Sequence, residues 1–365
     1  MGIAAGPLPN SKWIEVYARL GYGLLTYKTV RTVERAAFPA PNLVFCGLGD
    51  PAVVEPTPRR LDPAAVTWAA SFGLPSAKPE VWRADVAKAR ARLPKSQLLV
   101  VSVIGTPAPG GDGEQLARDY AQAARWAAEA GADVVEAHLS CPTISAERPQ
   151  MVFEDQALAA HVVEMVRRAV GARPVVAKLG AMRSPRALHD LATALARWVD
   201  GFALVNDLQR RLVKPDGTLA LPGEGRELAG IAGAVVWDHS RVQVRELIAW
   251  RKAGAWDRAI LAVGALPPWS ERARRSRREP RRRWWPRPPS WIRSSPRASG
   301  ARSPAETDRL TEERDGSGSA GRSRAPAPGT RGPNPRSPSS MALRSCSRSV
   351  TMRISSERPA RFTLS

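Results

Sequence analysis

The segment 136–143 (EAHLSCPT) places a single cysteine, Cys141, between an apolar run and a proline. The apolar run, residues 133–139, has the composition of a buried strand, and it ends abruptly in a polar turn. In a barrel of parallel strands, such a turn lies at the catalytic end. A cysteine in this position can act as a proton-abstracting base if its surroundings favour the thiolate. The alternative is an inert buried thiol, because cysteine is also a common small core residue.

Two lysines, Lys28 and Lys178, each stand at the end of a separate apolar run. A lysine in such a place can simply extend its ammonium group to solvent. Two lysines at the ends of different strands of one barrel would instead converge on an anion. We therefore predict an anion-binding site that contains both. His138 either points into this site or has a structural role inside the barrel.

Short apolar runs alternate with amphipathic segments over the first 264 residues, which is typical of a parallel sheet covered by helices. The expected strands are residues 3–5, 24–28, 98–104, 134–139, 175–179, 202–206 and 260–263. The expected helices are residues 11–20, 113–130, 154–170, 184–198 and 240–252. Seven strands predict an α/β fold of the (β/α)8 TIM-barrel type, incomplete, with about seven of eight units. An open doubly wound sheet is disfavoured because no GxGxxG motif follows the first strand.

The formal net charge of +21 is concentrated in the last part of the chain. Residues 267–365 contain 23 arginines and no lysine, and no apolar run of strand length follows residue 265. We therefore divide the chain into a barrel domain, residues 1–266, and a disordered basic tail rich in Arg, Pro and Ser, residues 267–365. The tail is either a nucleic-acid-binding arm or the product of an out-of-frame reading of GC-rich DNA. The absence of lysine favours the second interpretation, so no nucleic-acid partner is expected.

The three cysteines are widely separated, and no CxxC pair or Cys/His cluster indicates a metal site or a disulfide framework. No signal peptide and no apolar run of about 18 residues is evident. We therefore expect a cytoplasmic protein with no membrane contact and no metal.

Several separated motifs resemble the FMN-dependent dihydroorotate dehydrogenases, in the soluble branch that uses cysteine as its base. The resemblance covers residues 2–264. The motifs occur in the family's order: GIAAGPLPNS (2–11), LTYKT (25–29), SFGLPS (71–76), LSCPT (139–143), VVAKLG (175–180), LVND (204–207), GRELAGIAG (225–233) and AILAVGA (259–265).

The resemblance implies a catalytic site with bound FMN, although the eighth strand and the loop after it, which helps to hold the cofactor phosphate, are missing. The residues beside the cofactor would be Ala5, Gly6, Lys28, Lys178, Asn206, Gly230 and Gly264. The residues beside a dihydroorotate-like substrate would be Lys28, Ser71, Phe72, Gly73, Leu74, His138, Thr143 and Asn206. Cys141 would remove a proton from C5 of dihydroorotate while a hydride leaves C6 for the flavin. The implied activity is oxidation of dihydroorotate to orotate in pyrimidine biosynthesis, by a homodimer.

Four positions differ from the family pattern, which usually has asparagine there: Ala70, Ser76, His138 and Thr143. Those amides normally hydrogen-bond the pyrimidine ring and its carboxylate. An unsatisfied group of this kind changes affinity by ~1–3 kcal/mol. Two alternatives therefore stay open: a flavin barrel that acts on another dihydropyrimidine-like substrate, and an inactive barrel that carries a basic nucleic-acid-binding arm.

Overall fold

The computed structural model describes residues 1–47, 53–55, 66–140, 151–221, 223, 226–254, 256–264 and 351–353. The chain divides into two compact units, and every described residue belongs to the unit formed by Met1–Arg287 and Cys346–Ser365. The rest of the predicted tail lies outside the described residues.

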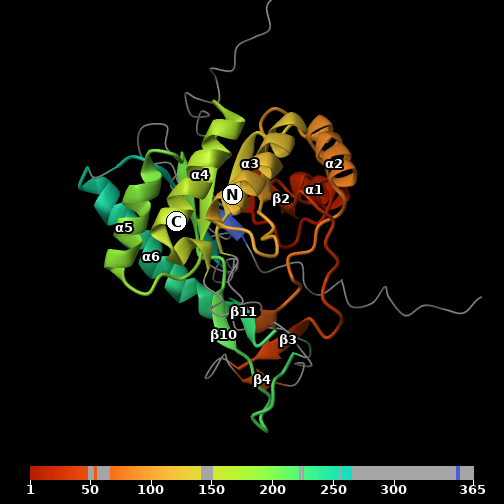
Figure 1. The fold of residues 1–365 in the computed structure, drawn as a ribbon, viewed down its shortest axis with the longest axis vertical. Coiled ribbons are helices and arrows are strands. Elements are labelled where there is room, and N and C mark those ends of the chain that lie inside the picture. The colour runs from red at the N-terminus through yellow and green to blue at the C-terminus, as the bar shows by residue number, and fades with distance from the viewer. Residues whose placement is uncertain are drawn as a thin grey trace, which may run out of the picture. The chain divides into compact units, whose positions relative to one another are not determined.

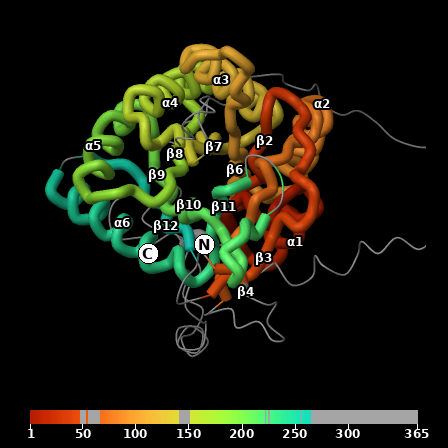
Figure 2. The backbone as a smooth tube through the Cα atoms, turned by 60° about the horizontal axis from the view of Figure 1, so that its bottom comes forward, coloured from red at the N-terminus to blue at the C-terminus, as the bar shows by residue number. Residues whose placement is uncertain are grey.

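A barrel forms the body of this unit (Figure 2). Its strands, in their order around the barrel, are β1 (Gly2–Ile3), β2 (Leu24–Val30), β6 (Leu98–Val103), β7 (Val134–His138), β8 (Val175–Leu179), β9 (Gly201–Leu204), β12 (Ala259–Gly264) and β13 (Thr351–Arg353). The first seven run parallel to their neighbours among themselves, which confirms the seven predicted strands and the α/β barrel class.

The eighth position in the barrel is taken by β13, which the sequence did not predict. This strand pairs antiparallel with both β12 and β1, and its Met352 is the register partner of Val263 and of Gly2. A barrel of seven strands leaves two edges of unpaired backbone groups, and any extended segment can pair with them. Three residues in an arginine-rich sequence carry no periodic signal, so the pattern gave no indication of this strand.

Helices follow most of the barrel strands and surround them (Figure 1). They are α1 (Ser11–Arg19), α2 (Pro79–Arg92), α3 (Gly113–Glu129), α4 (Gln156–Val170), α5 (Pro185–Ala196) and α6 (Ala234–Lys252), with a short 3-10 turn, η1 (Val152–Glu154), before α4. Side-chain oxygens of Asn10, Asp112, Asp155 and Ser184 accept hydrogen bonds from the first free N–H groups of α1, α3, α4 and α5. Helix α2 was not predicted, because it buries only a narrow apolar stripe: Trp82, Val86 and Ala89.

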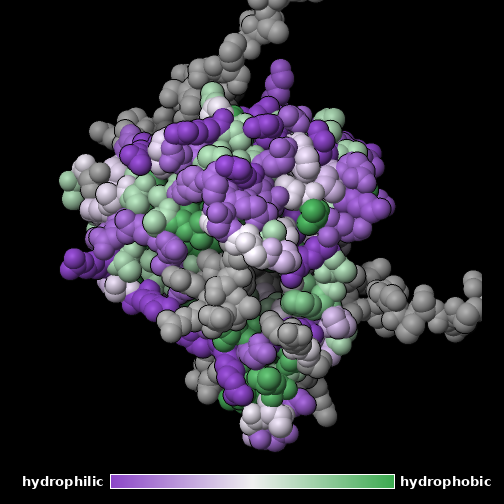
Figure 3. All heavy atoms as spheres, viewed as in Figure 1, coloured by the Kyte–Doolittle hydropathy of each residue, from purple (hydrophilic) through white to green (hydrophobic). Residues whose placement is uncertain are grey.

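A second sheet is built from two segments that leave the carboxyl ends of barrel strands. Its strands, in spatial order, are β10 (Leu208–Arg211), β11 (Leu228–Gly233), β5 (Thr67–Ala70), β3 (Leu43–Cys46) and β4 (Val54–Glu55). Three of them follow β2 and two follow β9, so the sheet lies at the catalytic end of the barrel (Figures 1 and 2). Apolar surface gathers over this region in Figure 3, and three exposed apolar residues adjoin the sheet: Phe72, Leu219 and Leu228.

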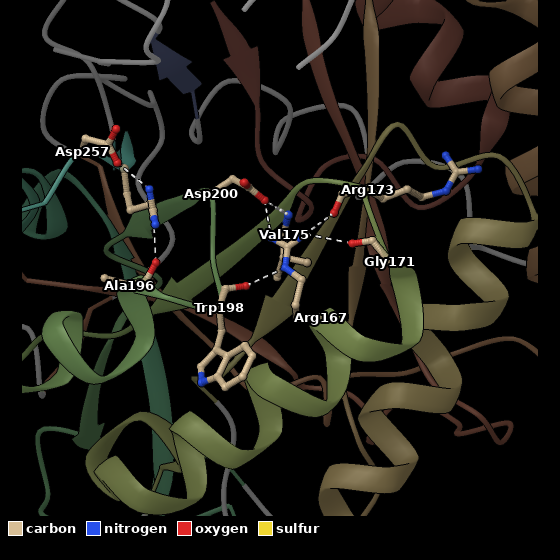
Figure 4. A network of polar contacts seen from close by, with 9 residues as sticks. Arg167, Gly171, Arg173, Val175, Ala196, Trp198, Asp200 and Asp257 are labelled. Carbon is tan, nitrogen blue, oxygen red and sulfur yellow. Dashed lines mark hydrogen bonds and ion pairs between the residues drawn. The ribbon is translucent and has the colours of Figure 1, made fainter. Parts of the chain in front are cut away.

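A partly buried network ties the opposite, amino-terminal end of the barrel together (Figure 4). Asp200 precedes β9, accepts a 2.8 Å hydrogen bond from the N–H of Val175 at the start of β8, and pairs with Arg167 of α4. The Arg167 guanidinium also donates to three backbone carbonyls, those of Gly171, Arg173 and Trp198. One arginine therefore satisfies groups from α4, the turn before β8 and the turn before β9, which fixes the register of this part of the barrel.

We expect the Arg167→Met substitution to lower the free energy of unfolding by about 2 kcal/mol, because it leaves several partly buried acceptors without a donor. Urea denaturation measures this change. Arg168 provides the matched control, since it is the next residue of α4 and pairs with Glu164 at the surface. Arg168→Met should change the stability by less than about 0.5 kcal/mol. Equal effects of the two substitutions would contradict this role of Arg167.

Candidate active site at the mouth of the barrel

His138 and Lys178 face each other on neighbouring barrel strands. They are register partners of β7 and β8, so their side chains leave the sheet on the same side. Both are nearly buried, with exposed fractions of 3% and 5%. The N–H of Leu139 donates to the carbonyl of Lys178 at 3.0 Å, and the Tyr120 hydroxyl donates to the carbonyl of His138 at 2.8 Å. These bonds hold the ends of both strands.

Lys28 comes to the same mouth by the alternation of side chains along β2. Tyr27 donates a 2.8 Å hydrogen bond to Asp85 on the outer helix α2, so the next side chain, that of Lys28, points to the other face of the strand. The pairing of β2 with β6 is regular up to Tyr27 and resumes at Val30, with an extra residue between these points. Lys28 is electrostatically coupled to Lys178.

The mouth carries concentrated positive charge. Burial, followed by the charges of Lys178 and Arg31, lowers the pKa of Lys28 to about 8. Burial, followed by the charges of Lys178, Lys28 and Arg31, lowers the pKa of His138 well below its usual value. His138 is therefore neutral at physiological pH. Neither Lys28 nor Lys178 forms an ion pair with a carboxylate among the described residues, so the cluster has capacity for an anion.

Asn206 lies beside this cluster, two residues after the end of β9. Its N–H donates to the Leu179 carbonyl at 3.0 Å, and its side-chain amide donates to Asp207 at 2.8 Å. Burial raises the pKa of Asp207, while a hydrogen bond from Gln209 and the charge of Lys178 act in the opposite direction. The lysine cluster and this carboxyl therefore belong to one electrostatic unit.

Gly230 of β11 packs against Asp207. A Cβ atom at Gly230 would lie 2.4 Å from the Asp207 Oδ2, so a larger residue at this position would displace the Asp207 carboxyl. Gly230 is also the register partner of Ala70, the last residue of β5. The second sheet therefore brings the loop that follows β5 next to Asp207 and Asn206.

That loop, residues 71–74, has an unusual backbone. Gly73 and Leu74 both have positive φ angles, of 74° and 50°. A Cβ atom at Gly73 would lie 2.9 Å from the Phe38 ring, which adds a steric reason for glycine. The N–H groups of Phe72, Gly73 and Leu74 donate no hydrogen bond within the described part of the chain. Consecutive unpaired N–H groups form a concave surface that suits an anion or a carbonyl oxygen.

The structure describes some of the other expected site residues but not all of them. Cys141 and Thr143 lie outside the described residues, which stop at the buried Ser140. Ala5, which follows β1, is buried, and Gly6 is exposed. The turn that begins with these two residues is bonded to β2, because the N–H of Lys28 donates to the Leu8 carbonyl at 2.9 Å.

Gly264 ends β12 at the same end of the barrel. A Cβ atom there would lie 3.2 Å from the Trp237 ring. The structure thus gathers Lys28, Lys178, His138, Asn206, Gly230 and the 71–74 loop. Sequence reasoning missed Arg31, Asp207 and Gln209. A polar residue shortly after a strand end was the available signal for each of them.

Two negative findings apply to the described residues. No helix in the described part of the chain is long and apolar enough to cross a membrane. No group of three or more His, Cys, Asp or Glu side chains within the same residues could hold a metal ion.

The fold and the mouth define the class of protein: an α/β barrel with a cationic site at the carboxyl ends of its strands. No family model matches the chain. The chain is similar to a protein named dihydroorotate dehydrogenase from Dictyostelium discoideum, with 29% identity over 252 residues. The match covers 65% of this chain and 66% of that relative, so it spans slightly less than two thirds of the relative's length.

The lowered pKa of Lys28 predicts a pH-dependent stability. The folded chain loses the Lys28 proton near pH 8, whereas the unfolded chain keeps it to about 10.5. Between these values the unfolded state binds more protons, so the free energy of unfolding should rise with pH relative to a Lys28→Met variant. Urea denaturation at intervals from pH 7 to 10 measures the difference. The difference in free energy of unfolding between the wild type and Lys28→Met should be constant well below pH 8.

The exposed Lys12 serves as the control for this measurement. The Lys12→Met variant should follow the wild type at every pH. A wild-type minus Lys28→Met difference that stays flat from pH 8 to 10 would show that Lys28 is not desolvated at this mouth.

Proposed function

We propose that the chain is an FMN-dependent oxidoreductase that oxidises the CH–CH bond of dihydroorotate to give orotate, in pyrimidine biosynthesis. The observation that carries the proposal is the convergence of Lys28 and Lys178 beside a neutral His138 at the carboxyl end of the barrel. The similarity to a protein named dihydroorotate dehydrogenase supports it. A cytoplasmic location and a homodimeric assembly belong to the same proposal.

The described residues fit a flavin mononucleotide at this mouth. Lys178 would hold the electron-rich edge of the ring, where its positive charge stabilises added electrons. Ala5, Gly6 and Gly230 would lie beside the ring, because small residues let a planar group approach the backbone. Gly264, at the end of β12, would lie near the phosphate, in keeping with phosphate sites of barrels of this type. When bound, the flavin supplies the acceptor for a hydride.

The substrate would be held by groups with complementary charge and geometry. The protonated Lys28 and the N–H groups of the 71–74 loop suit a carboxylate and ring carbonyls. The amide of Asn206 suits the polar edge of a pyrimidine ring. Loss of the Lys28 proton would weaken this binding as the pH rises through about 8.

We assign the base to Cys141, which follows the buried Ser140 in the chain. Its thiolate would take the proton from C5 of the substrate as the hydride leaves C6, so that a C=C bond forms between the two carbons. The neighbouring lysines would favour the thiolate. Thr143 and His138 would complete the surroundings of the ring.

Replacing Cys141 with alanine tests this assignment. In flavin-loaded protein under anaerobic conditions, Cys141→Ala should slow flavin reduction by dihydroorotate about 10²–10⁴-fold, because a general base contributes that much. Stopped-flow absorbance of the flavin measures the rate. Cys46→Ala is the control, since Cys46 is buried in β3 of the second sheet and has no place in the proposed chemistry. An undiminished rate in Cys141→Ala would exclude Cys141 as the base.

A second candidate function is oxidation of another dihydropyrimidine-like substrate. The observation that favours it is His138, a buried neutral imidazole where the resembling family has an amide. An imidazole has one donor and one acceptor and cannot reproduce the two donors of an amide group. The inactive-barrel alternative depends on the tail at residues 267–365, most of which lies outside the described residues, and it stays a prediction.

A panel of dihydropyrimidines separates the two candidates. If dihydroorotate is the substrate, it should reduce the flavin at least tenfold faster than analogues without the carboxylate, because they leave Lys28 unpaired. A carboxylate-free analogue that reacts faster than dihydroorotate would favour the second candidate.

A further inference from the structure

The loop at residues 71–74 adopts a backbone that its own sequence does not enforce. Leu74 has a φ of 50°, a conformation that L-residues with a side chain rarely adopt, and it follows Gly73 at 74°. The loop is also exposed at Phe72, whose exposed fraction is 40%. A strained and exposed loop keeps one conformation only when its surroundings determine it.

Arg31 holds the carboxyl-terminal end of this loop. Its exposed fraction is 4%, and its Nε donates to the Leu74 carbonyl at 3.0 Å. The same guanidinium donates to the Gly105 carbonyl and to the Thr106 hydroxyl, each at 3.0 Å. Arg31 thus links the loop to the end of β6, a barrel strand.

Arg226 holds the amino-terminal end. Its exposed fraction is 2%, and it donates to the Ser71 carbonyl at 3.2 Å. It also donates to the carbonyls of Pro39 and Pro41, at 3.1 and 2.7 Å. Its guanidinium lies 5.2 Å from the centre of the Phe38 ring, the ring against which Gly73 packs.

We infer that Arg31 and Arg226 are positioning residues that clamp the two ends of the 71–74 loop and so hold its unpaired N–H groups in the geometry that binds substrate. The inference rests on the proposed function for the role of those N–H groups. The clamp itself rests only on the hydrogen bonds of Arg31 and Arg226. A planar guanidinium with five donors can bind carbonyls from separate segments at once, which an ammonium group cannot do with the same geometry.

Arg31 has a second effect that Arg226 lacks. Its charge is one of the causes that lower the pKa of Lys28, and Arg226 is not among those causes. Loss of Arg31 should therefore raise the pKa of Lys28, and loss of Arg226 should leave it in place. This difference separates the two residues in a pH profile.

Limited proteolysis tests the clamp without any substrate. Chymotrypsin should cut the full-length chain after Phe72 about tenfold faster in Arg31→Met and in Arg226→Met than in the wild type, after the rates are divided by the cleavage rate at sites elsewhere in the chain, which corrects for any loss of global stability. Mass spectrometry identifies the cut between Phe72 and Gly73. Arg211→Met is the matched control, because Arg211 is an exposed residue at the end of β10 in the same sheet. Cleavage rates of the two variants that equal that of Arg211→Met would overturn the inference.

Kinetics with flavin-loaded protein test the consequence for the substrate. Both variants should raise the KM for dihydroorotate about tenfold while kcat changes less than about threefold, because a misplaced loop weakens binding. The KM should rise at basic pH as Lys28 loses its proton, and Arg31→Met alone should move this rise to higher pH. A KM equal to that of the control in both variants would overturn the positioning role.

The two arms distinguish the clamp from the proposed function. If dihydroorotate fails to reduce the wild-type flavin, the proposed function fails, and the cleavage rates still decide on the clamp. If the methionine variants do not fold, Arg31→Lys and Arg226→Lys replace them. These variants keep the positive charge but lose the planar guanidinium group with its five donors, so chymotrypsin should still cut them faster than the wild type. Wild-type cleavage rates in both lysine variants would contradict the clamp.

Discussion

The repulsion among Lys28, Arg31 and Lys178 is the constraint on which the mouth of the barrel depends. Two like charges about 4 Å apart repel by about 4 kcal/mol at an effective dielectric constant of 20, and the repulsion falls in inverse proportion to their distance. The lowered pKa of Lys28, about 8, reflects this repulsion together with burial, and His138 stays neutral and so adds no further charge. A bound anion would lower the cost of this repulsion. Binding and stability are therefore linked at this mouth: the charge that destabilises the empty site is the charge that would attract the ligand.

Such a site needs a rigid frame, and the barrel supplies it at the opposite end. Asp133 lies one residue before β7, and Asp200 lies one residue before β9. Each accepts a hydrogen bond from the N–H of a residue in the preceding barrel strand. Each also pairs with an arginine of a surrounding helix, Arg90 or Arg167. The two ends of the barrel thus have separate tasks, since one fixes strand register and the other concentrates charge.

The second sheet brings distant segments to the cationic mouth. Pairing of β5 with β11 places Gly230 opposite Ala70, and Gly230 packs on Asp207. Residues from positions near 70, 207 and 230 thereby meet beside Lys178. The two buried arginines extend this arrangement to the 71–74 loop, so the substrate side of the mouth depends on contacts between segments more than 150 residues apart in the chain.

The sequence by itself determined the parallel barrel, because continuous apolar strands alternating with amphipathic helices leave few other ways to bury both faces of a sheet. It also indicated Lys28 and Lys178, since strand ends of one barrel meet at one edge. The roles of Cys141 and Thr143 stay predictions from motif resemblance. The sequence did not indicate β13 or the second sheet, whose strands other than β11 have four residues or fewer and give no periodic pattern.

Only the tertiary structure decided which polar groups belong together. Arg226 hydrogen-bonds to Ser71 across 155 residues of sequence, and Gly230 of β11 packs on Asp207. The folded barrel also buries Lys28 beside Arg31 and Lys178, which couples their charges. Local propensity cannot specify such contacts, because they arise from the register of one strand against another and from which side chains that register buries.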